Sequence, residues 1–509
     1  MLLIDLVITS ERVAATASRS EKQALLAGAL RALSMEELPV GVALLSGEVR
    51  QRHTGVGWAA LRDMPSPAAT PTLELGAVDA ALERLQSVAG AGSTTARAGE
   101  VHQLFARATA SEQRFLASVM AYGLRQGASR GVLIGALAQA AGVGLAALRR
   151  ALMLDGDLGS VARVALDEGE AGLGRVALRV GRPVEPMLAS PAPDLASALE
   201  RAGEEAVVEA KLDGVRIQVH CCGDGAIRVF TRTLDEITAR VPEVREAVRA
   251  LPVRTAILDG ELIALQPSGR PHPFQVTAAR FGTREPADLE RRSTPLAVRF
   301  FDLLHVDGVD LLDLPAHERF ARLDEVVPAR LRVNRAGDGP AADFEAATLA
   351  AGHEGVVVKA LSAPYAAGRR GVGWLKVKPR HTLDLVILAA EWGHGRQGGK
   401  LSNLHLGARG ADGAFVMLGK TFKGMTDEML AWQTEALLAL EERRTRGTVF
   451  VRPELVVEIA FDGLQSSTRH PGGVTLRFAR VLRHRPDKEA GDADTVDAVQ
   501  AIGSDIPTG

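Results

Sequence analysis

The sequence predicts a multidomain protein of the class α + (α+β) + β. Its 509 residues are too many for one hydrophobic core, and 46 % hydrophobic with 24 % charged residues is a globular composition. The pattern of apolar residues also changes twice along the chain, near Arg182 and near His381. These changes divide the chain into regions of different secondary structure.

The first region, residues 1–178, is rich in Ala and Leu. Its apolar residues recur at the spacing of an amphipathic helix, most clearly in segments 21–33, 112–124 and 132–153. Stretches rich in Gly, Ser and Pro separate these segments. We therefore expect an all-helical domain.

The second region, residues 182–380, alternates short β-branched runs with helical segments. The runs 205–211, 215–220 and 256–264 have the length and composition of strands, and 316–326 has the spacing of a helix. This alternation predicts a mixed α+β domain.

From residue 381 to 487 the chain consists of short strands with Gly-rich turns. We expect strands at 449–461 and 474–483 and one helix at about 426–442. A small β-barrel of the OB-fold type fits this pattern. Residues 488–509 are acidic and rich in Gly and Asp, so we expect a flexible acidic tail.

Bulk properties exclude some classes of protein. The formal net charge of −2 gives no overall positive field, although a local basic groove would suffice for binding nucleic acid. The two cysteines, Cys221 and Cys222, are adjacent and cannot supply a multi-ligand zinc site. No window reaches the ~20 uninterrupted apolar residues of a membrane span, and the N-terminus lacks the features of a signal peptide. We expect a cytoplasmic protein without a membrane partner.

One strand carries the residue that we expect to be chemically active. In VVEAKLDGVRIQVH (207–220), strand alternation places Glu209 and Lys211 on one face. A lysine between apolar neighbours is costly to bury charged, so part of it would be a neutral, nucleophilic amine. The letters K-x-D-G alone are a weak signal, because a strand that ends in an Asp-Gly turn looks the same.

Two further blocks offer carboxylates. In LDGELIAL (258–265), Asp259 and Glu261 share one strand face, which suits a divalent cation. In HEGVVVK (353–359), Glu354 begins another strand. The first of these blocks is therefore a candidate mount for a metal ion.

Two other blocks suit phosphate and a nucleobase. In WLKVKPR (374–380), Lys376 and Lys378 project from one face and would repel each other unless an anion lies between them. In FFDLLHVDG (300–308), an aromatic side chain at the head of an apolar strand could stack on a base.

In this order, the blocks resemble the covalent nucleotidyltransferases, a superfamily of ATP-dependent DNA ligases, RNA ligases and mRNA capping enzymes. The resemblance covers nearly the whole chain and is greatest to multidomain bacterial ATP-dependent DNA ligases. It implies a nucleotidyltransferase (ATP-grasp-like ligase) core that uses ATP and Mg²⁺, or Mn²⁺. It implies sealing of 3′-OH/5′-phosphate nicks in double-stranded DNA, through enzyme-lysyl-AMP and DNA-adenylate. It further implies a monomer in the bacterial cytoplasm, associated with the nucleoid.

The resemblance also implies roles for single residues in nucleotide binding. Lys211 would attack the α-phosphate of ATP, and Glu209 would read the adenine amino group. Phe301 would stack on adenine. Arg216 would contact the ribose or the DNA 5′-phosphate, and Arg232 would help to hold the nucleotide and the same phosphate.

A second group of residues would handle metal and phosphate charge. By the same resemblance, Glu261 and Glu354 would organise the metal, and Glu261 would also contact the ribose. Lys376 and Lys378 would clamp the α-phosphate.

The last block, RFARVLRHRPDK (477–488), resembles the family segment that swings over the active site and orients the pyrophosphate leaving group. Its candidate side chains are Arg480, Arg483, Arg485 and Lys488. A solvated basic strand edge would have the same composition.

The helical region separates the members of the superfamily. Segments 115–143 and 149–162 resemble the DNA-binding domain of the larger ATP-dependent DNA ligases. Arg125, Gln126 and Gly127 match a loop that approaches the duplex backbone, where Gly127 would permit close approach and Arg125 would contact phosphate. The alternative is that these residues only cap helices of a bundle.

Three other functions compete with a DNA ligase that uses ATP. An NAD-dependent ligase carries a four-cysteine zinc module, which two adjacent cysteines cannot supply. An RNA ligase or a capping enzyme would lack the helical region. A non-catalytic protein that binds DNA ends would not need to keep the charged blocks.

Overall fold

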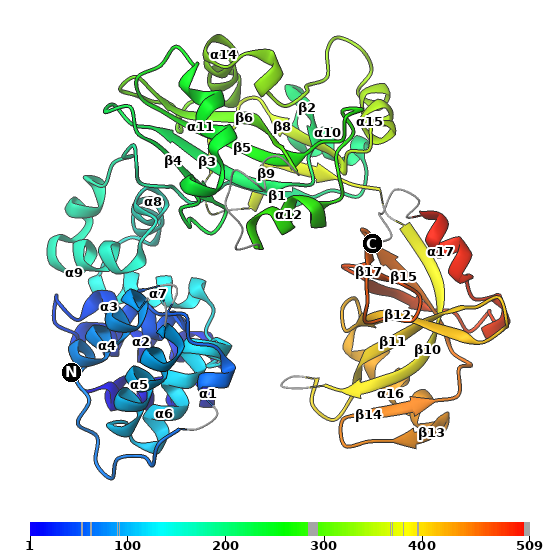
Figure 1. Ribbon diagram of the computed structural model, residues 1–509, viewed down its shortest axis with the longest axis horizontal. Helices are drawn as coiled ribbons and strands as arrows, with labels where there is room; N and C mark the ends of the chain where they lie inside the picture. The colour runs from blue at the N-terminus through cyan, green and yellow to red at the C-terminus, as the bar shows by residue number, and fades with distance from the viewer. Residues whose placement is uncertain are drawn as a thin grey trace.

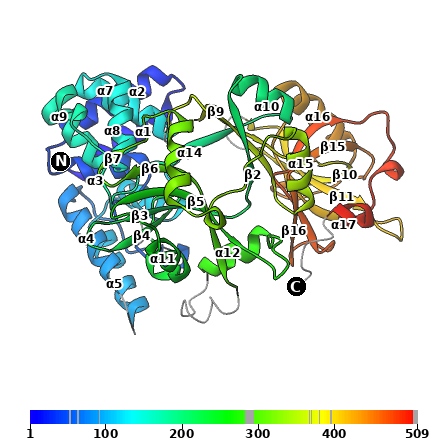
Figure 2. The ribbon, with the colours of Figure 1, turned by 90° about the horizontal axis from the view of Figure 1, so that it is seen from above.

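The computed structural model describes residues 1–51, 54–61, 64–88, 90, 92–282, 294–366, 368, 370–379, 381–393 and 397–502. Over these residues the chain forms a helical domain, a mixed central domain and a β-rich C-terminal domain (Figure 1). The central domain lies between the other two, and the view from above shows the same order (Figure 2). The three domains therefore form an arc.

The helical domain is held by one core of Leu, Val and Ala side chains, in which Leu26, Leu30 and Phe105 are fully buried. Within the described residues, no single helix is long and apolar enough to cross a membrane. One bent pair of helices, Arg130–Ala141 with Leu145–Asp155 at 117°, meets that test of length and composition together. The helices of this domain are α1 (Leu3–Ala15), α2 (Arg19–Ala32), α3 (Leu38–Ser46), α4 (Leu75–Ser87), α5 (Ser93–Ala106), α6 (Ala110–Ala117), α7 (Arg130–Ala141), α8 (Leu145–Asp155) and α9 (Leu158–Gly174).

The central domain contains two sheets. Its elements are β1 (Leu188–Pro191), α10 (Leu195–Ala202), β2 (Ala206–Lys211), β3 (Val215–Cys221), β4 (Ile227–Thr231), α11 (Pro242–Arg249), β5 (Ala256–Ala264), α12 (Phe274–Gly282), β6 (Leu296–Val306), β7 (Val309–Asp310), α14 (Ala316–Val326), α15 (Ala341–Ala350), β8 (Gly355–Ala360) and β9 (Arg370–Val377). One sheet has the order β1-β9-β8-β2 and the other β4-β3-β5-β6-β7. Every pair is antiparallel except β1 with β9.

Alternation along β2 positions the residues of the central pocket. Val208 and Ala210 are buried in apolar clusters. Glu209 and Lys211 lie on the opposite face of the strand, as its period of two requires. The next strand, β3, begins at Val215 after a turn, so β2 and β3 belong to different sheets and Lys211 lies at the junction.

The C-terminal domain is built around a seven-stranded sheet in which β15 pairs with both β10 and β18. A separate hairpin consists of β16 and β17. The elements of the C-terminal domain are β10 (His381–Trp392), β11 (Leu401–Arg409), β12 (Phe415–Thr421), α16 (Asp427–Ala439), β13 (Glu441–Arg444), β14 (Thr448–Val451), β15 (Val456–Phe461), β16 (Gly463–Ser466), β17 (Val474–Arg477), β18 (Arg480–His484) and α17 (Val496–Ile502).

The expected strand at 474–483 is two strands. Phe478 adopts a left-handed backbone conformation with φ 56°, and this conformation ends β17 and lets β18 begin in another sheet. The expected strand at 449–461 is also divided, into β14 and β15. Single expected strands were therefore wrong at both places.

Polar contacts join the domains. On the side of the helical domain, Arg150 Nη1 donates to Asp313 Oδ1 at 2.6 Å. On the other side, Arg477 Nη1 of the C-terminal domain donates to Asp213 Oδ2 at 2.9 Å. The Ser466 hydroxyl lies 3.4 Å from Gln275 Oε1. The hairpin of β16 and β17 thus faces the central domain.

The expected flexible tail is wrong for most of its length. Residues 496–502 form α17, in which Val499 is fully buried in the core of the C-terminal domain. Ala493 is also buried, and the Asp494 carboxylate accepts a hydrogen bond from the Asp384 backbone N–H at 2.7 Å. Acidic residues occupy the exposed positions, so the composition of this segment did not indicate a short helix packed on the domain. Residues 503–509 lie outside the described residues.

Replacing Val499 tests this packing. We expect Val499→Ala to destabilise the C-terminal domain by roughly 2 kcal/mol, because it leaves a cavity in a buried cluster. Chemical denaturation followed by circular dichroism would measure the change. Asp497→Ala, at an exposed position of the same helix, is the control. Equal stability of Val499→Ala and wild type would contradict the packing of α17.

Candidate functional site

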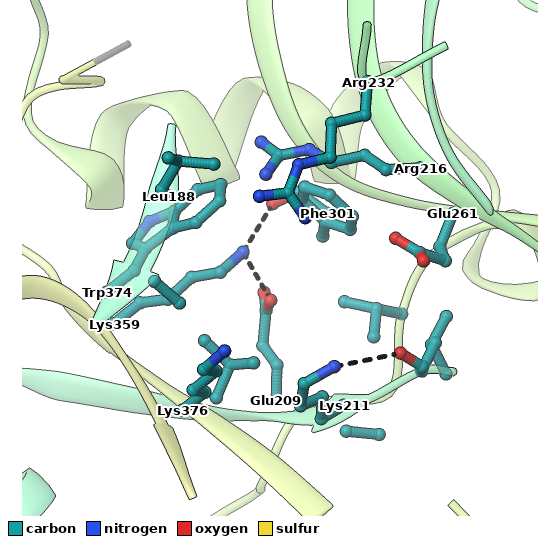
Figure 3. Close-up of a pocket in the computed structure, with 15 residues that line it drawn as sticks. Leu188, Glu209, Lys211, Arg216, Arg232, Glu261, Phe301, Lys359, Trp374 and Lys376 are labelled. Carbon is teal, nitrogen blue, oxygen red and sulfur yellow. Dashed lines mark hydrogen bonds and ion pairs between the residues drawn. The ribbon is translucent and has the colours of Figure 1, made fainter. Parts of the chain in front are cut away.

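A cavity of about 190 Å³ lies between the two sheets of the central domain (Figure 3). Cationic side chains outnumber acidic ones in its lining, which favours an anionic ligand. The lining residues are Leu188, Ala189, Glu209, Ala210, Lys211, Leu212, Arg216, Arg232, Glu261, Phe301, Val333, Val357, Lys359, Trp374 and Lys376.

Lys211 lies at the floor of this pocket and is held by Glu354. The Lys211 ammonium forms an ion pair with Glu354 and also donates to the Leu212 carbonyl at 3.3 Å. Lys378 binds the other oxygen of Glu354. Burial opposes ionisation of Glu354, but the two lysines outweigh it and lower the pKa of this carboxyl. Glu354 therefore stays charged between two cations.

Glu261 presents a different carboxylate to the same pocket. Burial raises its pKa from 4.5 to about 7, and the nearby Lys211 and Arg216 only partly oppose this rise. A partly buried carboxylate whose charge is incompletely balanced would bind a cation or a hydrogen-bond donor favourably.

Glu209 lies on the wall next to Lys211. Its side chain is only 2 % exposed, and Lys359 Nζ lies 2.5 Å from its Oε2 atom. Lys359 also donates to the Phe301 carbonyl at 3.0 Å and lies 4.5 Å from the centre of the Trp374 ring (Figure 3). Burial lowers the pKa of Lys359, although Glu209 opposes this effect.

Arg216 closes another side of the pocket through a forked ion pair. Its Nε and Nη2 atoms lie 3.0 and 2.5 Å from the two oxygens of Asp259. The Tyr365 hydroxyl donates to the same carboxylate at 2.6 Å. The Arg216 guanidinium also lies 5.4 Å from the centre of the Phe301 ring. Both oxygens of Asp259 are therefore bound by protein groups in this structure, and Asp259 is not among the residues that line the pocket, so a role for it in mounting a metal stays a prediction.

The structure brings many of the expected residues together and leaves others apart. The expected residues that line the pocket are Glu209, Lys211, Arg216, Arg232, Glu261, Phe301 and Lys376. Glu354 and Lys378 join them through the ion pair with Lys211.

The basic side chains of 480–488 lie elsewhere. Arg483 pairs with Glu458 at 2.6 Å, whereas Arg485 and Lys488 both bind Asp384, at 3.0 and 2.6 Å. Neither these residues nor Arg480 line the pocket. In this conformation the segment belongs to the C-terminal domain alone, so a role of these residues at the pocket stays a prediction.

The expected DNA-contacting loop is only partly available at the surface. Arg125 is exposed, and Gly127 has φ 69°, with its carbonyl accepting a bond from Lys22 Nζ at 2.8 Å. Gln126 is buried, and its amide donates to the Leu45 carbonyl at 2.6 Å. Direct contact of Gln126 with DNA is therefore incompatible with this conformation, because the side chain is used in packing.

Sequence reasoning missed several residues of the site. Lys359 ends the strand that Glu354 precedes, but nothing nearby in sequence pointed to Glu209 as its partner. Arg477, which binds Asp213 across the domain boundary, begins a basic block in which later residues were preferred. Only the fold identifies these partners.

The pocket meets part of what a divalent cation requires. Among the described residues, no group of three His, Cys, Asp or Glu side chains could hold a metal ion. Mg²⁺ commonly uses one or two carboxylates and takes its other ligands from substrate phosphates and water. Glu261 and Glu354 fit that mode, so a metal here would require the nucleotide.

Three family models match successive parts of the chain. They are the DNA ligase N terminus at residues 60–138, the ATP dependent DNA ligase domain at 186–378 and the ATP dependent DNA ligase C terminal region at 397–488. The central match covers both sheets around the pocket. The fold and site are those of a ligase, an enzyme that forms phosphodiester bonds.

Relatives that match nearly the whole chain support the same family. The chain is 56 % identical over 508 residues to a probable DNA ligase of Mycolicibacterium gilvum, covering 99 % of each chain, and 54 % identical to one of Beutenbergia cavernae with the same coverage. The solved structure Pmar-Lig_PreS3 shares the fold with a TM-score of 0.60 at 16 % identity, covering 94 % of this chain and 99 % of that one. The protein belongs to the family of ATP-dependent DNA ligases.

The raised pKa of Glu261 predicts a pH-dependent stability. The folded state binds this proton more tightly than the unfolded state, so stability falls as pH rises from about 4.5 through 7. We compare the free energy of unfolding of Glu261→Gln with that of wild type. As pH rises from 5 to 8, we expect this difference to shift in favour of the variant by about 3 kcal/mol. Chemical denaturation at both pH values would measure this difference. Glu318→Gln, at an exposed carboxylate, should follow wild type; the same behaviour of Glu261→Gln would refute the shift.

Proposed function

We propose that this protein seals nicks in double-stranded DNA between a 3′-hydroxyl and a 5′-phosphate, with AMP carried first on Lys211 and then on the DNA. The observation that carries this proposal is the position of Lys211 in a cation-rich pocket. The same pocket is lined by a hydrogen-bond acceptor, Glu209, and by the aromatic ring of Phe301. That combination suits a nucleotide whose α-phosphate lies near the lysine.

In this proposal each wall of the pocket binds one part of ATP. Glu209 accepts a hydrogen bond from the adenine amino group, and Phe301 stacks on the base. Arg216 and Arg232 bind the ribose or the DNA 5′-phosphate. Lys376 and Lys378 neutralise charge on the α-phosphate, since phosphoryl transfer spreads negative charge over the equatorial oxygens.

The reaction would proceed in three phosphoryl transfers at one site. The Lys211 ammonium first loses a proton to solvent. Its amine then attacks the α-phosphorus, a nitrogen–phosphorus bond forms as the bond to pyrophosphate breaks, and the nitrogen releases a second proton to solvent. The DNA 5′-phosphate then attacks the lysyl-AMP and restores the lysine. Finally the 3′-hydroxyl attacks the activated 5′-phosphate and releases AMP. Each transfer develops charge on a phosphate, so the same cations serve all three.

Lys211 must leave its ion pair before it reacts. In the structure its ammonium is bound to Glu354, and Lys378 competes for the same carboxylate. Phosphate oxygens in the pocket would attract Lys211 away from Glu354, whose charge Lys378 would still balance. Glu261 and Glu354 would hold Mg²⁺ or Mn²⁺, which would supply a Lewis acid beside the phosphates.

We further propose a division of labour among the domains. Residues 1–178 would bind DNA, with Arg125 on the phosphate backbone, and residues 182–380 would form the ATP-grasp-like adenylation core. Residues 381–487 would form an OB-fold that closes on the nicked duplex. The binding would be independent of sequence and sensitive to salt, because ligation must work at any nick.

The C-terminal domain would change its orientation during the reaction. Its β16–β17 hairpin now faces the central domain through Arg477. By contrast, Arg483, Arg485 and Lys488 form ion pairs within their own domain, and Arg480 pairs with Ala460 on the neighbouring strand. For these residues to orient pyrophosphate, the domain would turn toward the pocket in the first step.

Labelling with radioactive ATP tests the nucleophile. Wild type with Mg²⁺ should retain AMP after denaturation, and Lys211→Ala should retain none because its methyl side chain cannot form the bond. Lys423→Ala, at an exposed lysine, should label as wild type does. Label on a folded Lys211→Ala protein would disprove the assignment, and GTP or NAD⁺ as the better donor would indicate another class of nucleotidyltransferase.

Separating the steps tests the movement of the C-terminal domain. We expect Lys488→Ala to slow self-adenylation about 100-fold, because one cation near the leaving group is lost. Sealing of a nick that already carries AMP should stay near the wild-type rate. The control is Arg452→Ala, which removes a surface ion pair with Glu454 in the same domain. Equal losses in both steps for Lys488→Ala would contradict this proposal.

A further inference from the structure

A partly buried arginine outside the pocket holds the carboxylate of Glu209. Arg335 Nε donates to Glu209 Oε1 at 2.9 Å, while Lys359 lies 2.5 Å from Oε2. Each oxygen of this carboxylate therefore has its own cation. Arg335 does not line the pocket, and it lies 126 residues from Glu209 in the sequence.

Arg335 is itself fixed on two sides. Its Nη1 atom donates to both oxygens of Asp324, at 2.9 and 3.1 Å. Its guanidinium lies 4.5 Å from the centre of the Phe320 ring. Both partners belong to α14, so the helix supports the arginine and the arginine supports Glu209.

The backbone around Arg335 is attached to the strand that carries Glu209. The Ala210 N–H donates to the Asn334 carbonyl at 2.9 Å, and the Ala336 N–H donates to the Val208 carbonyl at 2.8 Å. These bonds flank Arg335 and Glu209 on their two chains. The distance between the arginine and the carboxylate is thus set by main-chain hydrogen bonds as well as by the ion pair.

This support determines what Glu209 can offer a ligand. A carboxylate has about four acceptor positions, and Arg335 and Lys359 use one on each oxygen. The remaining positions can still accept a hydrogen bond. The two cations, one on each oxygen, also keep the carboxylate from rotating, so its remaining acceptor positions point in fixed directions.

We propose that Arg335 is a positioning residue that makes the enzyme select a purine with a 6-amino group. The inference rests on the proposed contact between Glu209 and the adenine amino group. The fixed Glu209 oxygens accept a bond from a 6-amino donor and repel the 6-oxo acceptor of guanine or hypoxanthine. A purine without a 6-substituent leaves the carboxylate one bond short.

The chain offers a matched control in Arg332. This residue also forms an ion pair with Asp324, and among the described residues it forms none with Glu209. Arg332→Gln therefore disturbs the same support without touching the carboxylate. Arg335→Lys keeps the charge of Arg335 but not its two-sided geometry, so it should restore part of the function.

The experiment measures kcat and KM for self-adenylation of the full-length protein with ATP and with purine riboside triphosphate, which lacks the amino group. Arg335→Gln should raise KM for ATP about 10-fold and lower the preference for ATP about 10-fold, with kcat nearly unchanged. Glu209→Gln should lower the preference at least as much. Arg335→Lys should be intermediate and Arg332→Gln close to wild type.

The contrary outcomes are distinct. If Glu209→Gln keeps the preference for ATP, then the proposed role of Glu209 fails, and this inference fails with it. If Glu209→Gln loses the preference but Arg335→Gln keeps it, then the inference alone is wrong. Equal losses with both nucleotides, or equal effects in Arg332→Gln and Arg335→Gln, would show a merely structural role. Thermal unfolding of each variant identifies loss of folding.

Discussion

The ion pairs of Glu354 with Lys211 and Lys378 hold the site together, because buried charges are tolerated only when they are balanced. Lys378 extends the chain of charges to the C-terminal domain, where Asp462 lies 3.4 Å away. The lysine at the pocket floor is thereby linked electrostatically to a neighbouring domain. An anion that enters the pocket would change the balance of every member of this chain, which connects nucleotide binding with domain contacts.

Local sequence patterns predicted the secondary-structure elements in which buried and exposed residues follow a regular pattern. The strands β2, β3 and β5 lie within one or two residues of the expected runs, since alternating or continuous apolar residues reflect one or two buried faces. The patterns failed where one residue changes the direction of the chain. The break between α7 and α8, for instance, lies at Gly142 with φ 66°, inside a run of uniform helical spacing.

The sequence predicted those site residues that lie on strands, because strand side chains alternate between two faces with a period of two. Glu209 and Lys211 share a face of β2 for that reason, and the fold then brings Phe301 and Glu261 to the same cavity. The supporting residues were not foreseeable, because an arginine such as Arg335 has many conceivable partners along the chain. Burial likewise explains the C-terminal helix, since Val499 becomes apolar core only where the folded C-terminal domain provides a surface.

The left-handed residue at Phe478 gives one basic stretch of chain two separate directions. Arg477, before it, reaches the central domain, whereas Arg483 and Lys488, after it, form ion pairs within the C-terminal domain. Because strand side chains alternate, inserting or deleting one residue here would exchange the outward and inward positions of everything that follows. The length of this stretch is therefore as strongly constrained as its charges. In homologous chains, substitutions here should be more common than insertions or deletions.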